Sequence, residues 1–207
     1  MKLLVIGATG GTGTEIVKQL LERDHHVSAL IRDPSRFDIK HKNLSVTAGS
    51  IEEVGILKKM ASDVDAVISA LGSRKLSESD LQQTFARNSI ASMKDTRSKR
   101  LIVISAWGVG DSKQHATFAM RLIYATFLRN IFADKNKAEK LYFASDLEYT
   151  LIKPGRLMDD KSKGNVRASV SGKPDVTNYI SRTDVAAFAI DQIDSDQYSR
   201  ASPIIGY

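Results

Sequence analysis

Short apolar runs alternate along the chain with longer segments in which apolar residues recur every three or four positions. The short runs predict buried β-strands, and the longer segments predict amphipathic helices. The predicted strands are 1–6, 27–31, 44–48, 66–70, 101–105 and 148–153, with shorter ones at 169–172, 178–180 and 203–205. The predicted helices are 13–23, 51–60, 81–93, 114–132, 135–145 and 181–193.

This alternation predicts an α/β fold, a doubly wound parallel sheet with helices on both faces. We expect one domain over residues 1–207, in which 154–207 form a small C-terminal extension on the substrate side. Right-handed crossovers place the carboxyl ends of the strands at one edge of the sheet. A ligand at that edge could touch residues that follow all the main strands: Gly7, Arg32, Gly49, Gly72, Ser105 and Pro154.

The segment 114–132 holds more large apolar side chains than a plain surface helix needs. We expect core packing for most of them. A cover over the substrate side or an interface with a partner are the alternatives.

A glycine pattern follows the first apolar run directly and opens the first predicted helix. Gly7, Gly10 and Gly13 have the spacing Gly-x-x-Gly-x-x-Gly. A strand, a tight turn and a helix N-terminus form the arrangement that holds the pyrophosphate of a dinucleotide. Gly7 can adopt the turn's dihedral angles, Gly10 leaves room for phosphate oxygens, and Gly13 lets the helix pack close to the strand. Thr9 and Thr12 can add hydroxyl donors, so the sequence predicts a nucleotide site.

The end of the second predicted strand bears on which dinucleotide binds there. In doubly wound folds this position faces the adenosine ribose, where an acidic residue favours NAD and an arginine accommodates the 2′-phosphate of NADP. Arg32 and Asp33 supply both types, and Arg36 follows closely. We favour NADP(H) over NAD(H), with Arg32 and Arg36 as a two-sided phosphate clamp. The alternative is that Asp33-Pro34-Ser35 is an ordinary turn with charged neighbours.

Composition limits the remaining functional classes. The chain is 42% hydrophobic and 26% charged, which is ordinary for a globular protein. It has no cysteine, its four histidines lack metal-ligand spacing, and we expect no metal site. The net charge of +6 favours anionic partners, but basic runs interleaved with aromatic residues are missing, so we expect no nucleic acid. With no signal peptide and no apolar run long enough to span a bilayer, we expect a cytoplasmic protein without membrane contact.

Several segments together resemble the atypical short-chain dehydrogenase/reductase superfamily. Within it the chain is most similar to the Rossmann-like NAD(P)H-binding group that contains flavin reductase/biliverdin-IXβ reductase. The matching segments are IGATGGTG (6–13), LIRDPSR (30–36), DAVISALGSR (65–74), LIVISAWG (101–108), SDLEYTLIKPG (145–155) and ISRTDVA (180–186).

The resemblance implies roles for residues at matching positions. The turn from Thr9 through Gly10 and Gly11 to Thr12 would hold the pyrophosphate, and Arg32 and Arg36 the 2′-phosphate. The adenine would lie by Ser50 and Ile51. The residues expected near the rest of the cofactor are Leu71, Gly72, Ser73 and Arg74 at its centre, Ser105 at the nicotinamide, and Pro154 and Gly155 at the carboxamide.

The chain also departs from the pattern of its relatives. Gly49-Ser50 replaces the usual Gly-Asp, so adenine contact would depend on the Ser50 hydroxyl and backbone, and Lys153-Pro154-Gly155 replaces Arg-Pro-Gly. The Tyr-x-x-x-Lys pair of the alcohol dehydrogenases is missing from the helix after the fifth strand. Tyr149 and Lys153 have that spacing, but on a strand they would lie roughly 13 Å apart, which is too far for one acid/base unit.

Without that pair, the sequence favours an acceptor that stabilises its own charge, such as a flavin (FMN or FAD), a quinone or a linear tetrapyrrole. Ser105 and Arg156 are the candidate catalytic residues. The alternatives are a strand-end serine bonded to backbone and a solvated arginine. Trp107 could stack on an aromatic substrate or be buried under its loop. Lys135 and Glu139 have i,i+4 spacing, from which we expect a weak surface ion pair.

The sequence therefore predicts an NAD(P)H-dependent oxidoreductase that transfers hydride directly to a small-molecule acceptor. The alternative is a non-catalytic NADP(H)-sensing regulator of the nitrogen-metabolite-repression type. A nucleotide-sugar epimerase or dehydratase is a weaker third reading, because such relatives have a larger C-terminal lobe. The sequence does not indicate an oligomeric state.

Overall fold

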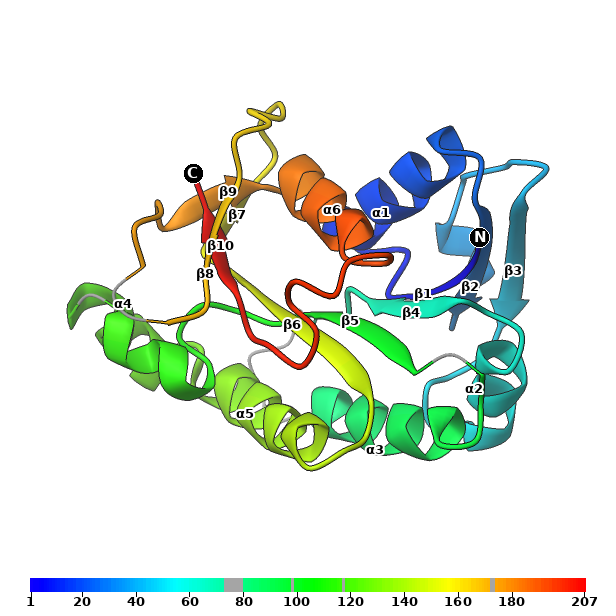
Figure 1. Cartoon of the computed structure of the whole chain (residues 1–207), viewed down its shortest axis with the longest axis horizontal. Helices are drawn as coiled ribbons and strands as arrows, with labels where there is room; N and C mark the ends of the chain where they lie inside the picture. Colours follow the sequence, from blue (N-terminus) through cyan, green and yellow to red (C-terminus); the bar gives the residue numbers. More distant parts are fainter. Residues whose placement is uncertain (73–79, 98, 117, 172–173) are drawn as a thin grey trace.

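A single twisted sheet forms the middle of the molecule in the computed structural model, which describes residues 1–72, 80–97, 99–116, 118–171 and 174–207 (Figure 1). The strand order is β3-β2-β1-β4-β5-β6-β10-β8, and every neighbouring pair is parallel except β10 with β8. Its strands are β1 (Lys2–Ile6), β2 (His26–Ile31), β3 (Leu44–Ala48), β4 (Ala66–Ser69), β5 (Arg100–Ile104), β6 (Glu148–Pro154), β8 (Arg167–Ser169) and β10 (Ile204–Gly206). The predicted doubly wound fold is confirmed.

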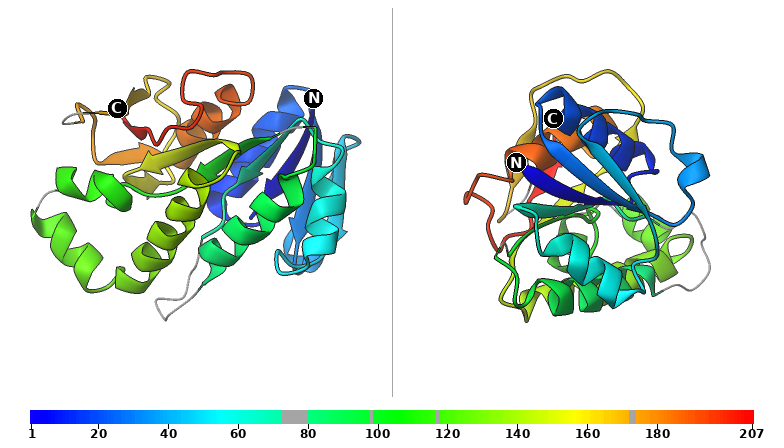
Figure 2. Two further views of the ribbon diagram at one scale, coloured as in Figure 1. Left: turned by 60° about the horizontal axis from the view of Figure 1, so that its bottom comes forward. Right: turned by 90° about the vertical axis from the view of Figure 1, so that its right-hand side faces the viewer.

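Helices cover both faces of this sheet. The helices α1 (Gly11–Glu22) and α6 (Arg182–Asp191) pack together on one face, and α2 (Val54–Ala61), α3 (Leu81–Met93) and α5 (Arg129–Phe143) cover the other (Figures 1 and 2). The central strand β1 shows the division, because Leu3 and Val5 belong to one apolar core and Leu4 and Ile6 to the other. Alternate side chains of a strand point to opposite faces, so one apolar run supplies both cores.

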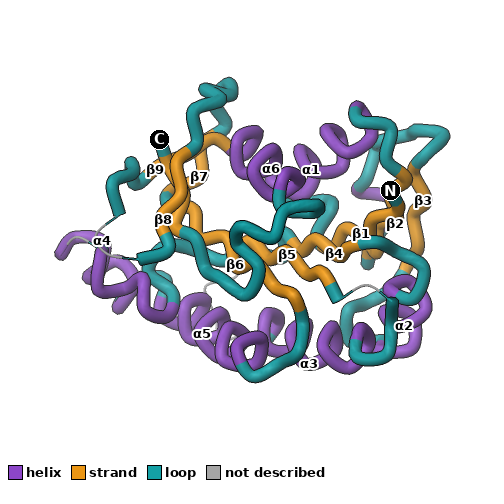
Figure 3. Tube along the Cα trace, in the orientation of Figure 1, coloured by secondary structure: helices purple, strands orange, loops and turns teal. Residues whose placement is uncertain are grey.

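A C-terminal part extends the sheet beyond β6. The short strands β7 (Arg156–Met158) and β9 (Tyr179–Ser181) pair in parallel beside it (Figure 3). Ser181 caps α6 by accepting a hydrogen bond from the Asp184 N–H at 3.0 Å. The buried Asp184 carboxylate accepts hydrogen bonds from the Ser181 and Tyr207 hydroxyls at 2.9 and 2.7 Å. This network fastens the last strand, the extension and α6 to one another.

The same network changes the acidity of Asp184. Burial raises the pKa of this carboxyl, but hydrogen bonds from Ser162, the Lys163 N–H, Tyr207 and Ser181 outweigh it and lower the pKa to about 2. Asp184 is therefore ionised at neutral pH and acts as an acceptor for the groups around it.

Most predicted elements occur where the sequence placed them, with ends that differ by a few residues. The segment 114–132 is an exception and was predicted wrongly as one helix. It contains the end of the 3₁₀ turn η2 (Gly110–His115), the short helix α4 (Phe118–Ala125) and the beginning of α5. The chain turns at 126–128 without a proline or glycine, so the break has no local signal. The strand β7 was not predicted.

Core packing was also the wrong prediction for part of that segment. Leu122, Ile123 and Phe127 are 57%, 47% and 71% exposed, whereas Phe132 on α5 is buried. The helix α4 lies at one end of the molecule, next to α5 (Figure 2). Among the described residues, no helix is long and apolar enough to cross a membrane.

Candidate functional site

The glycine turn after β1 has the geometry that close backbone packing demands. Gly7 has a φ of +80°, and a Cβ there would lie 2.8 Å from the carbonyl carbon and oxygen of Ala70, which follows β4. A Cβ on Gly13 would lie 2.1 Å from the Gly7 oxygen, so Gly13 lets α1 pack against the end of β1, as predicted. These contacts leave no room for side chains where the backbone turns between strand and helix.

The first turn of α1 offers hydrogen-bond donors to a ligand. Its N-cap is Gly10, which provides no side-chain cap, and within the described chain α1 has no acidic residue in its first turn. Gly10 itself is held by its N–H, which donates to the Gly7 carbonyl oxygen at 3.0 Å. A helix N-terminus of this kind favours an anion by its free N–H groups and its dipole.

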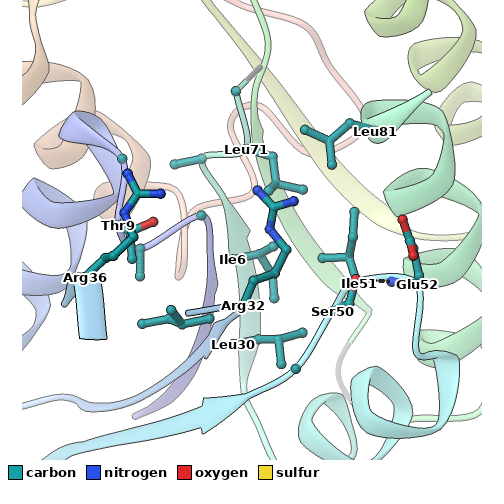
Figure 4. Close-up of a pocket in the computed structure, with 17 residues that line it drawn as sticks. Ile6, Thr9, Leu30, Arg32, Arg36, Ser50, Ile51, Glu52, Leu71 and Leu81 are labelled. Carbon is teal, nitrogen blue, oxygen red and sulfur yellow. Dashed lines mark hydrogen bonds between the residues drawn. The ribbon is translucent and has the colours of Figure 1, made fainter. Parts of the chain in front are cut away.

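A cavity of about 460 Å³ opens beside this turn at the carboxyl ends of β1, β2, β3 and β4 (Figure 4). It lies where strand order reverses between β1 and β4, the position at which doubly wound sheets bind ligands. Its volume falls in the range of small-molecule sites. Predicted residues that line it are Gly7, Thr9, Gly10, Arg32, Arg36, Ser50, Ile51, Leu71 and Gly72. The glycine cradle, the uncapped helix and the cavity together fit a dinucleotide.

Two arginines border the cavity at the end of β2. Arg32 follows the strand and Arg36 ends the 3₁₀ turn η1 (Pro34–Arg36), and both side chains reach the cavity (Figure 4). Asp33 is occupied elsewhere, because its Oδ1 accepts hydrogen bonds from the Ser35 N–H at 3.2 Å and the Ser35 hydroxyl at 2.6 Å. The two cations therefore face the cavity, while the neighbouring carboxylate caps its own turn.

The side of the cavity formed by the end of β3 contains residues that the sequence prediction missed. Glu52 and Leu81 line it together with the predicted Ser50 and Ile51. The Ser50 N–H donates to Glu53 at 2.8 Å, and its hydroxyl accepts from the Glu52 N–H at 3.3 Å. A strand end followed by a polar turn was visible in the sequence, but the approach of Leu81 from α3 was not.

Other predicted cofactor residues lie outside this cavity. Thr12 and Gly13 are buried in the first turn of α1. Gly11 faces α6 and lines a second hollow. Gly72 does line the main cavity, but a Cβ there would meet none of the described atoms within 4 Å, so close packing within the described chain does not require a glycine. Ser73 and Arg74 fall outside the described residues.

The predicted residues at the ends of β5 and β6 also lie away from the main cavity. Pro154 is buried at the end of β6. A Cβ on Gly155 would lie 2.3 Å from the Asn178 oxygen, so this glycine allows the β7 segment to approach β9. Arg156 is exposed on β7, and its N–H donates to the Asn178 carbonyl at 2.7 Å. Trp107 is 7% exposed, which is the buried alternative considered for it.

Ser105 follows β5 and belongs to a buried polar cluster. Its hydroxyl donates to Glu139 Oε1 at 2.6 Å, and Lys135 Nζ donates to the Ile104 carbonyl at 3.1 Å. Lys135 and Glu139 are 9% and 3% exposed, so the prediction of a surface ion pair was wrong. The i,i+4 spacing was read correctly as one helix face, but that face of α5 packs against the sheet.

Lys153 completes this cluster from β6. Its Nζ lies 3.1 Å from Glu139 Oε2 and 3.0 Å from Asp111 Oδ1, and its side chain is fully buried. Tyr149, on the same strand, instead packs its ring 5.8 Å from that of Phe143. Tyr149 and Lys153 therefore contact different groups, and their Tyr-x-x-x-Lys spacing is coincidental, as predicted.

Burial changes the acidity of Lys135 in this cluster. Desolvation lowers the pKa of its ammonium to about 8, against the opposing attraction of Glu139 and Asp134. Asp134 is held in place by accepting hydrogen bonds from the Gln82 and Gln83 N–H groups at 2.9 and 3.0 Å. A lysine with this pKa can give up or take a proton near neutral pH, which an ordinary surface lysine cannot do.

The cluster lies close to the nucleotide cavity but is separate from it in this structure. Ser105, Lys135 and Glu139 border a space of only about 10 Å³, which is the size of one water molecule. Gln82 connects the two regions, because its side-chain N–H donates to the carbonyl of Leu71, which lines the cavity, at 2.8 Å. Among the described residues, no group of three or more histidine or carboxylate side chains could hold a metal ion.

Comparison with known proteins gives the same fold and a family. Residues 7–196 match the NAD(P)H-binding family. The uncharacterized protein YwnB of Bacillus subtilis is 24% identical over 96% of this chain and 94% of its own length.

Two solved structures show the same architecture. A short-chain dehydrogenase/reductase from Veillonella parvula in complex with NADP superposes with a TM-score of 0.84 at 19% identity, over 100% of this chain and 94% of its own. The anaerobilin reductase ChuY from Escherichia coli O157:H7 superposes with a TM-score of 0.82, also at 19% identity, over 100% and 97% of the two chains. The glycine turn, the cavity at the strand ends and the match over nearly the whole sequence lead to one conclusion: the chain belongs to the NAD(P)H-binding family.

Proposed function

We propose that this protein is an NADPH-dependent reductase that transfers hydride directly to a conjugated small-molecule acceptor, such as a flavin or a quinone. One observation carries the proposal. A cavity of about 460 Å³ beside the glycine turn and a buried lysine with a pKa of about 8 lie at the carboxyl ends of neighbouring strands of one sheet. Reduction of a conjugated acceptor requires a hydride and a proton, and this arrangement could supply both.

The preference for NADPH follows from the charges at the end of β2. Arg32 and Arg36 both border the cavity, and in the described part of the chain neither forms an ion pair with a carboxylate. Asp33 could favour NAD only by turning toward the ribose, but its carboxylate is bonded to Ser35. A 2′-phosphate would therefore meet two guanidinium groups, whose geometry suits phosphate oxygens.

The residues around Ser105 have separate parts in this proposal. The bound dinucleotide would supply the hydride. Lys135 would deliver the proton, and Glu139 would hold the Ser105 hydroxyl in place by accepting its hydrogen bond. Lys153 would fix the position of Glu139 through the ion pair at 3.1 Å. The ChuY and Veillonella structures support the proposal by analogy, because one is named a reductase and the other holds NADP.

A second candidate is a non-catalytic NADP(H)-sensing regulator. The exposed apolar side chains of α4, Leu122, Ile123 and Phe127, favour it, since a docking surface for another protein would need such a patch. The closed space around Ser105 also suits a protein that binds the cofactor without using it. We place the reductase first, because a sensor has no need for a buried lysine of lowered pKa.

Absorbance at 340 nm tests the two functions. The protein is mixed with NADPH and, in separate reactions, with FMN, FAD, a small quinone or biliverdin as acceptor. The reductase predicts oxidation of NADPH well above a protein-free blank with at least one acceptor, and less with NADH. Binding of NADPH without turnover over this series would favour the sensor. No binding of either nucleotide would refute both.

A further inference from the structure

Arg182, the first residue of α6, lies directly against the pyrophosphate turn. A Cβ on Gly11 would meet the Arg182 side chain, with Cδ at 2.8 Å and Nε at 2.9 Å. Gly11 has an ordinary negative φ in the first turn of α1, so backbone conformation does not require a glycine there. The absence of a side chain at Gly11 instead makes room for the arginine. The sequence segments 6–13 and 180–186 thus meet at one point.

This contact places a guanidinium group at the N-terminus of α1. Arg182 and Gly11 line a hollow of about 500 Å³, which Thr9 shares with the main cavity on the other side of the turn. The hollow also contains carboxylates: Asp159 and Asp160 after β7, and Glu15 on α1. Because of these acidic groups, the hollow itself is a poor place for a phosphate. The edge of the turn, where the uncapped N–H groups of α1 point outward, is a better one.

Arg182 can give up its ion pair with Asp159 at a small cost in free energy. Arg182 Nη1 forms an ion pair with Asp159, whose side chain is 86% exposed, whereas that of Arg182 is 26% exposed. Ion pairs with so exposed a member contribute little to stability. A phosphate at the helix N-terminus offers two oxygens to the guanidinium and adds the favourable dipole of α1. Arg182 would therefore gain by leaving Asp159 for the ligand.

We propose that Arg182 is a pyrophosphate ligand, held ready by Asp159 and transferred to the dinucleotide when it binds. The role differs from that of Arg32 and Arg36. The pyrophosphate is common to NADH and NADPH, whereas the 2′-phosphate belongs to NADPH alone. Arg182 thus contributes to affinity for both nucleotides, and Arg32 to the choice between them. The inference depends on nucleotide binding and makes no use of hydride transfer.

Nucleotide titration followed by calorimetry or nucleotide fluorescence tests this assignment. We expect Arg182→Ala to weaken NADPH and NADH by the same factor, on the order of 10- to 100-fold, as removal of a charged hydrogen-bonding pair usually does. Arg32→Ala is the matched control, and it should weaken NADPH alone. Arg182→Lys should retain part of the affinity, because it keeps the positive charge but loses the planar guanidinium that can donate two parallel hydrogen bonds. Salt should weaken binding less steeply in Arg182→Ala than in the wild type.

Asp159→Asn provides an independent test that leaves Arg182 in place. The substitution removes the carboxylate charge that competes with the phosphate for the guanidinium group. Arg182 should therefore bind both nucleotides as tightly as in the wild type or a few-fold tighter. Unchanged affinity in a folded Arg182→Ala variant, or a loss confined to NADPH, would overturn the proposal. So would a loss in Asp159→Asn as large as in Arg182→Ala, since the ion pair would then only maintain local structure. Thermal melting of each variant verifies folding. A protein that binds NADPH but reduces no acceptor would refute the reductase and leave this inference intact.

Discussion

The buried lysine of α5 makes the sharpest prediction about catalysis. If Lys135 donates the proton, only its ammonium form supports turnover, and its pKa of about 8 sets the working range. With that pKa, about 90% of the molecules carry the proton at pH 7 and about 10% at pH 9. We therefore expect kcat/KM with the best acceptor to be flat below pH 7. Above pH 8 it should fall about tenfold per pH unit.

Two substitutions change this profile in different ways. Lys135→Met should reduce kcat by about 10²- to 10⁴-fold and abolish the alkaline fall, because no donor remains to be deprotonated. Glu139→Gln should move the alkaline fall to lower pH, since the Glu139 charge is the first of the groups that raise the pKa of Lys135. The control is Lys137→Met, an exposed lysine on the same helix, which should leave the profile unchanged.

The assay is NADPH oxidation at 340 nm between pH 6 and 10, at saturating and at limiting acceptor, with circular dichroism to verify folding. Two results would refute the reasoning. One is a Lys135→Met enzyme that keeps both the rate and the alkaline fall. The other is a Glu139→Gln enzyme whose fall lies at the wild-type pH or above it.

Three further measurements test the binding site and the framework. Arg32→Ala should raise the Kd for NADPH about 10- to 100-fold and leave that for NADH unchanged; equal loss of both would remove Arg32 from the 2′-phosphate site. Gly13→Ala should destabilise the protein by about 1–3 kcal/mol or more in chemical denaturation, because its Cβ would lie 2.1 Å from the Gly7 oxygen. Gly55→Ala on α2, where a Cβ meets nothing within 4 Å, should instead be neutral or stabilise by up to about 1 kcal/mol, and equal losses would contradict the packing argument. Asp184 has a lowered pKa, so its contribution to stability is present above the ordinary aspartate pKa near 4 and is lost as the pH falls toward 2. Asp184→Asn should lower the free energy of unfolding at pH 7 by about 1–3 kcal/mol and make the melting temperature less dependent on pH between pH 4 and 2. A variant whose melting temperature falls with acid as in the wild type would count against the network.

Sequence patterns predicted the fold and the nucleotide cavity because both depend on local features. An apolar run, three glycines at fixed spacing and a following helix leave few arrangements for residues 1–22. The parallel sheet then fixes where Arg32 and Leu71 must lie, since the strand ends share one edge. Residues at the ends of the strands on both sides of the strand-order reversal could therefore be assigned to the cavity without knowledge of any tertiary contact.

The buried cluster could not be predicted in the same way. Lys135 and Glu139 have the composition and spacing of a solvated helix face, and only the packing of α5 against β5 and β6 buries them. One signal was present in the sequence. Beyond Glu148 at its exposed first position, Lys153 is the one charge in the strand β6, and a buried cation requires a buried partner. A search for that partner would have led to a carboxylate on a helix that covers the sheet.

Arg182 illustrates a second kind of limit. It lies in the segment 180–186, and nothing in that segment links it to Gly11, which lies far away in the sequence. The pairing arises because α1 and α6 pack side by side on the same face of the sheet. Contacts between helices that are separated by most of the chain have no short-range pattern, so they must be taken from the structure.

The position of β1 in the middle of the sheet has a consequence for how the protein folds. Both neighbours of this strand come later in the sequence, β2 from His26 and β4 from Ala66. Until β4 exists, one edge of a strand with four fully apolar residues lacks its partner, and parallel pairing over such separations is slow. Incomplete chains that end before β4 should therefore associate through that edge, and early growth of a nascent polypeptide is the stage at which a chaperone would protect it most.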